Sequence, residues 1–220
     1  MNRTLLRTAD GSATIHIEEM NVTYHSRHGA VQESMHVFIN AGLVYYCNAR
    51  PEKKELNIFE MGMGTGLNVL LTADHAVEHD LNIYYETLEL HPLSNEETAL
   101  LDYGTYVKTD IHTIHNATWN SPVKLIERFT LKKVKQSLIE YRTPELFDII
   151  YFDAFAPTAQ PELWTEDIFH KMYGKLTQGG VLVTYCSKGD VRRAMIAAGF
   201  TVDKIQGPPG KREMLRATKQ

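Results

Sequence analysis

Three glycines on alternate positions constrain the fold of this chain more than any other feature of its sequence. Gly62, Gly64 and Gly66 follow a short apolar run at residues 58–61 and precede a second apolar run that begins at Leu67. The first run is typical of a strand buried on both faces, and the second is typical of a helix. A strand, a glycine turn and a helix in succession form the ligand-binding end of an open α/β sheet, where glycine lets the backbone approach a ligand closely. The sequence therefore predicts a ligand site at this turn.

Strand and helix patterns alternate from residue 57 onward, which predicts an α/β fold with a doubly wound, mostly parallel sheet. We expect seven strands, at residues 58–61, 81–90, 129–138, 146–152, 181–186, 201–205 and 213–217. We expect helices at residues 67–79, 92–103, 161–176 and 191–198, and short helical pieces in an insertion at about residues 104–128. Gly179 and Gly180 are expected to end the third of these helices.

The N-terminal residues have a different pattern. Residues 13–24 alternate loosely between apolar and polar, and residues 35–47 contain two apolar runs split by residues 40–42, which predicts a β-hairpin. We therefore expect a β-rich extension or lid at residues 1–55, followed by the main domain at residues 56–220.

Two acids indicate which ligand the glycine turn binds. A dinucleotide fingerprint needs glycine at position 67, where Leu67 stands. Glu60, two residues before Gly62, opposes a diphosphate by repulsion but suits an ammonium or sulfonium group. Glu89 ends the second strand, where a carboxylate accepts hydrogen bonds from ribose hydroxyls. Together they favour S-adenosyl-L-methionine over a dinucleotide; the alternative is a structural Glu60 that bonds to neighbouring backbone.

Asp153 follows the fourth predicted strand and is expected to face the ligand crevice. A carboxylate there accepts hydrogen bonds from an amine and helps to remove its proton, while Ala156 and Pro157 offer backbone carbonyls. Methyl transfer to an amine needs a neutral nitrogen held about 3 Å from the methyl group. The alternative is a carboxylate that caps the next helix.

Charge is distributed unevenly along the chain. The net charge is −4, yet residues 188–220 carry eight Lys or Arg against three acids. This basic end is compatible with a polyanionic partner, and the alternative is a solvated surface.

The remaining composition argues against export, membrane insertion and metal binding. The two cysteines form no CxxC pair, and no stretch approaches about 18 uninterrupted apolar residues, so we expect a cytoplasmic protein. His75 and His79 have the spacing of metal ligands on a helix, but without an HExxH pattern or an evident third ligand we expect no metal.

Six segments together resemble the methyltransferase domain of the MnmC-type tRNA-modifying enzymes. They lie at residues 24–43, 60–68, 88–94, 151–165, 179–200 and 207–215. The resemblance implies a Rossmann-like class I methyltransferase that uses S-adenosyl-L-methionine. It also implies the reaction, conversion of the 5-aminomethyl group of wobble (2-thio)uridine in tRNA to 5-methylaminomethyl.

The resemblance also implies roles for individual residues. The cofactor's methionine part is expected among Glu60, Gly62, Gly64, Gly66 and Asn68, and its ribose at Glu89. The target amine is expected at Asp153, with the backbone of Phe155 to Pro157. A motif expected to fold over the crevice supplies Tyr24, Ser26, Glu33 and His36. Phosphate contacts are expected from Lys188, Arg192, Arg193, Lys211 and Arg212.

The chain departs from the family pattern in two places. Bifunctional members carry a flavin oxidase domain after this point, so we expect another route to the aminomethyl substrate, such as a separate FAD-dependent oxidase. Methyltransferases of this fold often bind the adenine amine with an acid after the third strand, where this chain has Gln136 and Ser137. That contact stays unassigned, with Gln136 as a neutral substitute.

Two other functions stay open at this point. One is a polyamine-type aminopropyltransferase on a similar fold, although its usual second acid is replaced by Ala154 and Phe155. The other is a non-catalytic nucleotide- or RNA-binding module.

Overall fold

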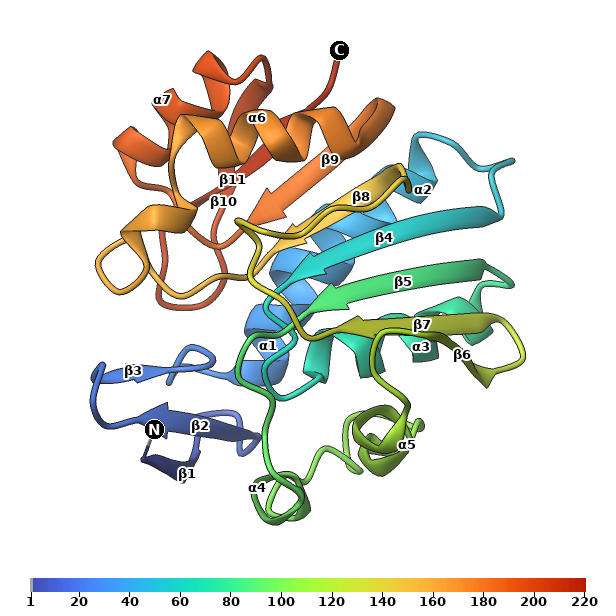
Figure 1. Cartoon of the computed structure of the whole chain (residues 1–220), viewed down its shortest axis with the longest axis vertical. Coiled ribbons are helices and arrows are strands. Elements are labelled where there is room, and N and C mark those ends of the chain that lie inside the picture. The colour runs from blue at the N-terminus through green and yellow to red at the C-terminus, as the bar shows by residue number, and fades with distance from the viewer. Residues whose placement is uncertain (1) are drawn as a thin grey trace.

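The computed structural model describes residues 2–220 and has a central eight-stranded sheet (Figure 1). Its strand order is β10-β11-β9-β8-β4-β5-β7-β6. The strands are β4 (Glu55–Met61), β5 (Asn82–Leu88), β6 (Pro122–Ile126), β7 (Phe129–Val134), β8 (Phe147–Phe152), β9 (Leu176–Thr184), β10 (Thr201–Gln206) and β11 (Glu213–Thr218). The five central strands β9, β8, β4, β5 and β7 pair in parallel, and the outer strands pair antiparallel. The predicted α/β fold with a mostly parallel sheet is confirmed.

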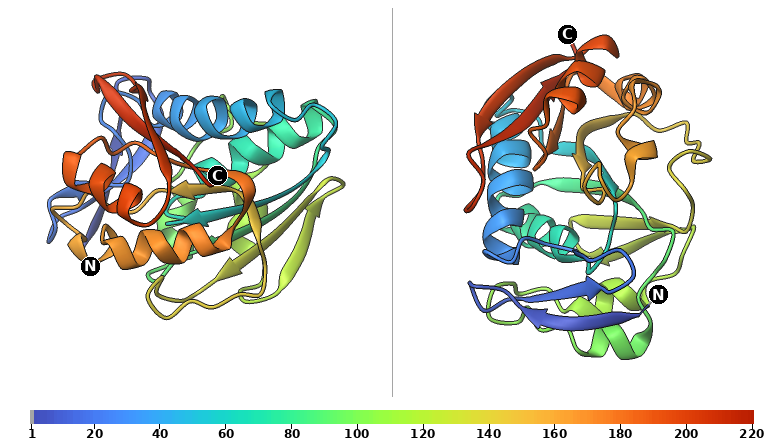
Figure 2. Two further views of the ribbon diagram at one scale, coloured as in Figure 1. Left: turned by 90° about the horizontal axis from the view of Figure 1, so that it is seen from above. Right: turned by 90° about the vertical axis from the view of Figure 1, so that its left-hand side faces the viewer.

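Helices cover both faces of this sheet, so the central strands are buried on both sides (Figure 2). Alternate residues of each strand point to opposite faces. On β4, Ile58 contributes to the core under α3 (Leu67–Glu78), whereas Phe59 contributes to the core under α6 (Glu166–Lys175) and α7 (Gly189–Ala197). This double burial explains why the strand is a continuous apolar run in the sequence.

The hairpin predicted at residues 35–47 is wrong. These residues belong to one continuous helical stretch, made of α1 (Ala30–Ser34), the π-helix η1 (Met35–Val44) and α2 (Tyr45–Asn48). Gly42 is not a turn residue but the point where this helix touches the sheet, because a Cβ there would lie 3.0 Å from Val183 Cγ2. A short apolar run does not distinguish a buried helix from a strand, and the predicted turn rested on composition alone.

The β-rich description therefore applies only to the first residues of the chain. Strands β1 (Arg3–Arg7), β2 (Ala13–Ile17) and β3 (Val22–Thr23) form a separate antiparallel sheet. Hydrogen bonds from the hydroxyls of Tyr103 to the Ala13 carbonyl (2.9 Å) and of Tyr106 to the Asp10 carbonyl (2.7 Å) attach it to the insertion.

Smaller differences concern the insertion and the helix ends. The insertion has the helix α5 (Ile111–Asn116) but also strand β6, which was not predicted. The helix predicted from residue 92 is only α4 (Asn95–Ala99), and a 3-10 turn η2 (Pro161–Leu163) precedes α6. Gly179 and Gly180 do not end a helix; they lie inside β9, where its register with β8 shifts.

Within residues 2–220, none of the helices has the length and apolarity needed to cross a membrane.

Candidate active site

A cavity of about 310 Å³ lies at the carboxyl ends of β4, β5 and β8. Its volume is in the range of small-molecule sites. Four of the predicted cofactor residues line it, namely Gly62, Gly64, Asn68 and Glu89. Asp153, Phe155 and Tyr24 line it as well. The crevice beyond the carboxyl ends of central parallel strands is where open α/β sheets bind ligands.

The glycine turn at the floor of the cavity requires residues without a side chain. Gly62, Gly64 and Gly66 have φ values of 91°, 52° and 81°, a region that other residues rarely adopt. A Cβ on Gly62 would lie 2.6 Å from the carbonyl oxygen of Asp153, and one on Gly64 would lie 2.6 Å from Cδ1 of Tyr24. The turn is therefore packed from both sides, by the end of β8 and by the N-terminal segment.

Glu89 is held in one orientation by the backbone. Its Oε2 accepts a hydrogen bond from the Gly64 N–H (3.0 Å), and its Oε1 accepts one from the His91 N–H (2.8 Å). Each carboxylate oxygen keeps a further lone pair for another donor. The carboxylate is thus held in a fixed orientation at the wall of the cavity.

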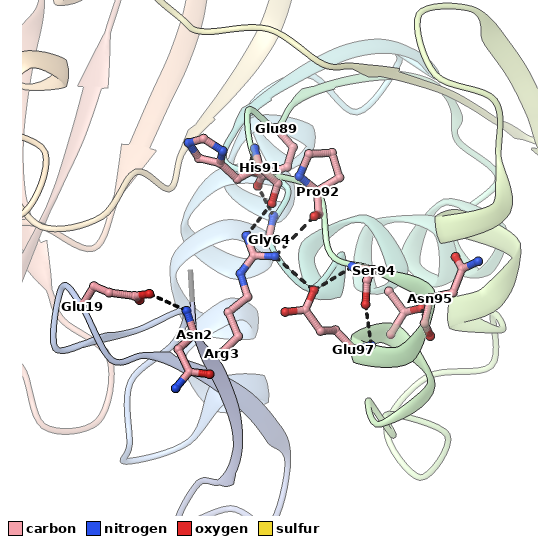
Figure 3. A network of polar contacts seen from close by, with 11 residues as sticks. Asn2, Arg3, Glu19, Gly64, Glu89, His91, Pro92, Ser94, Asn95 and Glu97 are labelled. Atoms are coloured by element: carbon pink, nitrogen blue, oxygen red, sulfur yellow. Dashed lines mark hydrogen bonds and ion pairs between the residues drawn. The ribbon is translucent and has the colours of Figure 1, made fainter.

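Arg3 fastens the N-terminal sheet to the loop that carries Glu89 (Figure 3). Its guanidinium donates hydrogen bonds to the carbonyls of His91 (2.6 Å) and Pro92 (3.3 Å), and it forms an ion pair with Glu97 (3.1 Å). Arg3 also lines the cavity. Nothing in the local sequence around Arg3 marks it as a site residue, so it was not predicted.

Asp153 lies directly after β8, and its surroundings disfavour the ionised form of its carboxyl group. Burial raises the pKa of Asp153 well above its usual range, and the charge of Glu33 raises it further. The amide of Asn68, which donates to Asp153 Oδ2 at 3.0 Å, and the ammonium of Lys211 oppose this shift of the pKa. A carboxyl group with a raised pKa is suited to accept a proton from a ligand.

The loop after Asp153 lines the cavity with Phe155, while two of its backbone carbonyls accept hydrogen bonds from elsewhere in the same loop. The Phe155 carbonyl accepts a hydrogen bond from Trp164 Nε1 (2.8 Å), and the Ala156 carbonyl accepts bonds from two backbone N–H groups. Pro157 does not line the cavity. The carbonyls of Phe155 and Ala156 thus bond within the loop itself, and the contact of this backbone with a substrate amine stays a prediction.

Apart from Tyr24, the predicted residues of the N-terminal motif lie outside the cavity lining, and two of them contact the C-terminal part of the chain. Glu33 accepts a hydrogen bond from the Ser26 N–H (2.7 Å) and forms an ion pair with Lys211 (2.6 Å). His36 Nε2 bonds to the backbone carbonyl at the end of β10 (2.8 Å). The Lys211 ammonium also lies 3.9 Å from the ring centre of Tyr185. Lys211 is thus engaged in contacts within the protein, although about a third of its side chain is exposed, and its phosphate contact stays a prediction.

The other predicted basic residues lie nearer the surface. Lys188, Arg193 and Arg212 are exposed, and Arg192 is half-buried. Arg193 forms an ion pair with Asp190 on α7. These side chains surround the start of α7 and the loop between β10 and β11.

Glu60 does not line the cavity, so the geometry gives no support to its predicted contact with a cofactor, which stays a prediction. Its side chain is fully buried and accepts a hydrogen bond from Thr87 Oγ1 (2.7 Å). Burial raises the pKa of Glu60 to about 8. The reason is the pleat of β4, which places Glu60 on the same face as Ile58, under α3, while the next residue, Met61, lines the cavity. Gly66 also lies outside the lining and precedes α3 as its N-cap.

The cavity lining also contains apolar and neutral polar residues. Leu90 and Ile139 line it although about half of each residue is exposed, and Gln136 and Ser137 line it as well. Exposed apolar side chains at a cavity mouth suit a flat aromatic ligand group. No acid follows β7 within the lining, in keeping with the neutral residues read from the sequence.

The chain is similar in sequence to a known methyltransferase family and to curated tRNA-modifying proteins. Residues 98–220 match a family model described as S-adenosyl-L-methionine-dependent methyltransferase. The chain is 30% identical over 210 residues to the tRNA 5-methylaminomethyl-2-thiouridine biosynthesis bifunctional protein MnmC of Ectopseudomonas mendocina, and 31% identical over 213 residues to that of Burkholderia multivorans. Each alignment covers 87% of this chain, which spans 31% of the length of either relative.

Solved structures show the same fold. The crystal structure of MNMC2 from Aquifex aeolicus superposes with a TM-score of 0.82 and 26% identity, and covers 98% of this chain and 70% of that one. Streptomyces venezuelae DesVI, with a TM-score of 0.52 and 12% identity over 86% of this chain and 92% of that one, is similar in fold alone.

Proposed function

Because this chain belongs to the S-adenosyl-L-methionine-dependent methyltransferase family, we propose that it methylates the primary amine of 5-aminomethyl-(2-thio)uridine at the wobble position of tRNA. The observation that carries the proposal is a carboxyl group with a raised pKa, Asp153, at the wall of the cofactor cavity. The names of the relatives supply the substrate, since they describe biosynthesis of the methylated product in tRNA.

The residues of the cavity fit S-adenosyl-L-methionine, which supplies a methyl group on a positively charged sulfur. The backbone at Gly62 and Gly64 is open to the methionine part, because no Cβ blocks the approach. Glu89 presents two oriented oxygens to the ribose hydroxyls. Leu90 and Ile139 would enclose the adenine, with Gln136 in place of the acid found in many methyltransferases of this fold.

Asp153 would prepare the amine for methylation. An alkyl amine near neutral pH is largely an ammonium ion, which has no lone pair with which to attack. Asp153 accepts a hydrogen bond from this ammonium and then its proton, and its raised pKa makes that transfer easier. The freed nitrogen forms a bond to the methyl carbon while the carbon–sulfur bond breaks on the opposite side. The remaining contribution is positioning of the two reacting atoms.

The two other candidate functions receive no support. The matching family is one of methyltransferases rather than aminopropyltransferases. A non-catalytic binding module would have no use for an acid with a raised pKa at the cofactor cavity.

The test is transfer of labelled methyl from S-adenosyl-L-methionine to tRNA that carries 5-aminomethyluridine. Asp153→Asn keeps the shape of the side chain but cannot take up a proton, so label incorporation should fall by at least about 100-fold. Its affinity for S-adenosyl-L-methionine should stay within about threefold of the wild type. The matched control is Asp203→Asn, an exposed aspartate on β10, which should methylate normally.

Three results would contradict the proposal. Near-normal turnover of Asp153→Asn would remove the role of Asp153. Label at a position other than the wobble uridine would contradict the substrate. Retention of tRNA without any label would favour a binding module.

A further inference from the structure

Glu60 on β4 is buried without the partners that a carboxylate needs. Its side chain has no exposed surface. One oxygen, Oε2, accepts a hydrogen bond from Thr87 Oγ1 at 2.7 Å, whereas Oε1 has no hydrogen-bond partner. Within residues 2–220 Glu60 forms no ion pair. A buried ionised carboxylate without a cation and with half of its acceptors empty is strongly destabilising.

A second buried acid in the same sheet has a hydrogen-bond partner for each of its carboxylate oxygens. Glu86 on β5 also has no exposed surface. Its oxygens accept hydrogen bonds from the ammonium of Lys132 (3.1 Å) and from the hydroxyls of Tyr141 (2.7 Å) and Tyr84 (2.9 Å). Three hydrogen bonds, one of them from a cation, therefore hold Glu86, whereas the carboxyl of Glu60 accepts a single hydrogen bond from a neutral hydroxyl.

Asn68 connects Glu60 to the site. Its Nδ2 donates a hydrogen bond to Asp153 Oδ2 at 3.0 Å, while its Oδ1 is buried and has no partner. Asn68 also lies within hydrogen-bonding reach of the Glu60 carboxyl. An ionised Glu60 would leave Asn68 Oδ1 without a donor, and its own Oε1 would depend on the Tyr85 hydroxyl, which is buried and unpaired as well. One proton on Glu60 converts one of these acceptors into a donor and satisfies both.

We propose that Glu60 carries its proton in the folded protein and donates it to Asn68, so that Glu60 is a positioning residue that orients the Asn68 amide toward Asp153. The proposal rests on the function proposed above for Asp153. With the proton present, the carbonyl side of Asn68 faces Glu60 and its NH₂ group faces Asp153. Without it, the charge on Glu60 would attract the amide hydrogens and turn Asn68 Oδ1 toward Asp153, where two acceptors repel.

The surroundings of Glu60 favour its neutral form. Burial raises its pKa to about 8, and the nearby charge of Glu89 acts in the same direction. The ionised form would gain hydrogen bonds from the hydroxyls of Thr87 and Tyr85 and from the amide of Asn68, which partly offsets this rise of the pKa. The other titratable groups that face Glu60 are Tyr151 on β8 and Asp153 after it, and neither is a cation. A neutral Glu60 also gives no electrostatic attraction to the sulfonium group of a cofactor.

The test compares Glu60→Gln with the wild type by urea unfolding between pH 5 and pH 9. The glutamine of this variant would reproduce protonated glutamic acid, because its carbonyl accepts from Thr87 and its NH₂ group donates to Asn68. The ordinary pKa of Glu60 is 4.5 and its folded pKa is about 8, so the folded wild type loses stability as the pH rises through this window. Glutamine does not titrate. The difference between the urea midpoints of Glu60→Gln and of the wild type should therefore increase with pH up to about pH 8 and stay constant above it.

Glu86→Gln is the matched control. It removes the ion pair with Lys132, so its midpoint should lie below that of the wild type, with no gain as the pH rises. Affinity for S-adenosyl-L-methionine should stay within about threefold in Glu60→Gln. Glu60→Ala, which has no donor for Asn68, should slow methyl transfer by at least about tenfold, and Glu60→Gln should restore most of that rate.

A midpoint difference that does not change with pH, together with a loss of affinity greater than about tenfold in Glu60→Gln, would overturn the proposal. If the variant does not fold, the carbon-13 signal of the Glu60 carboxyl in the wild type decides the question. A titration near pH 8 supports the proposal, and one near the ordinary pKa of 4.5 refutes it. The unfolding and affinity measurements involve no tRNA, so they stand even if the proposed substrate is wrong.

Discussion

Replacement of Gly62 by alanine tests how closely the glycine turn packs against Asp153. Gly62 has a φ of 91°, and a Cβ at this position would lie 2.6 Å from the carbonyl oxygen and 3.3 Å from the carbonyl carbon of Asp153. This carbonyl cannot move freely, because the N–H of the same residue is bonded to the Met61 carbonyl at 3.0 Å. We expect Gly62→Ala to destabilise the fold and to displace Asp153.

The magnitude follows from two contributions. A left-handed backbone costs a residue with a Cβ about 1–2 kcal/mol. An overpacked contact with atoms that must shift costs about 1–3 kcal/mol more. The free energy of unfolding should therefore fall by about 2–5 kcal/mol, which is a large part of the roughly 5–15 kcal/mol of a typical domain but leaves the protein folded at low temperature.

Urea unfolding measures this loss, and titration with S-adenosyl-L-methionine measures its effect on the cofactor site. Gly64→Ala should be less damaging, because its Cβ would meet a side chain, the ring of Tyr24, rather than backbone. Gly174 in α6 provides the opposite control, since nothing lies within 4 Å of its Cβ position. Gly174→Ala should raise stability by about 0.5–1 kcal/mol through helix propensity. A Gly62→Ala variant within about 0.5 kcal/mol of the wild type would refute the close packing of the turn.

Two further predictions concern the charged residues around the site. Lys211→Met leaves the buried side of Glu33 without its cation, and because Lys211 is partly exposed we expect a loss of only about 1–2 kcal/mol in unfolding free energy. Lys211 lowers the pKa of Asp153, so its removal should shift the acidic limb of the pH–rate profile to higher pH, and an unchanged profile would argue against this coupling. Replacement of Arg192 and Arg193 together by alanine should weaken tRNA binding and reduce the slope of log affinity against log salt by about 1.4–1.8, as expected for two phosphate contacts. A salt slope equal to that of the wild type would instead leave these arginines as ordinary surface residues.

The comparison of sequence and structure separates local from non-local information. The strand, turn and helix at residues 55–78 follow from apolar runs and glycine spacing, and these were predicted correctly. The helix at residues 30–48 was not, because its apolar run is equally compatible with strands until its packing partner is known. The orientation of Glu60 was missed for a different reason. A position near the end of a strand suggests the crevice, but the pleat turns this side chain beneath α3.

The sequence by itself determined the α/β class, the position of the cofactor turn and the acid at the end of β8. Each of these depends on the chain's own short-range pattern, which persists whatever the rest of the molecule does. Only the tertiary structure decided which side chains meet there. The ion pair of Lys211 with Glu33 joins residues 178 positions apart, and Arg3 reaches the Glu89 loop from a separate sheet. Burial and pairing at such distances shift the pKa values of Asp153 and Glu60, because desolvation depends on what surrounds a group and not on its neighbours in the sequence.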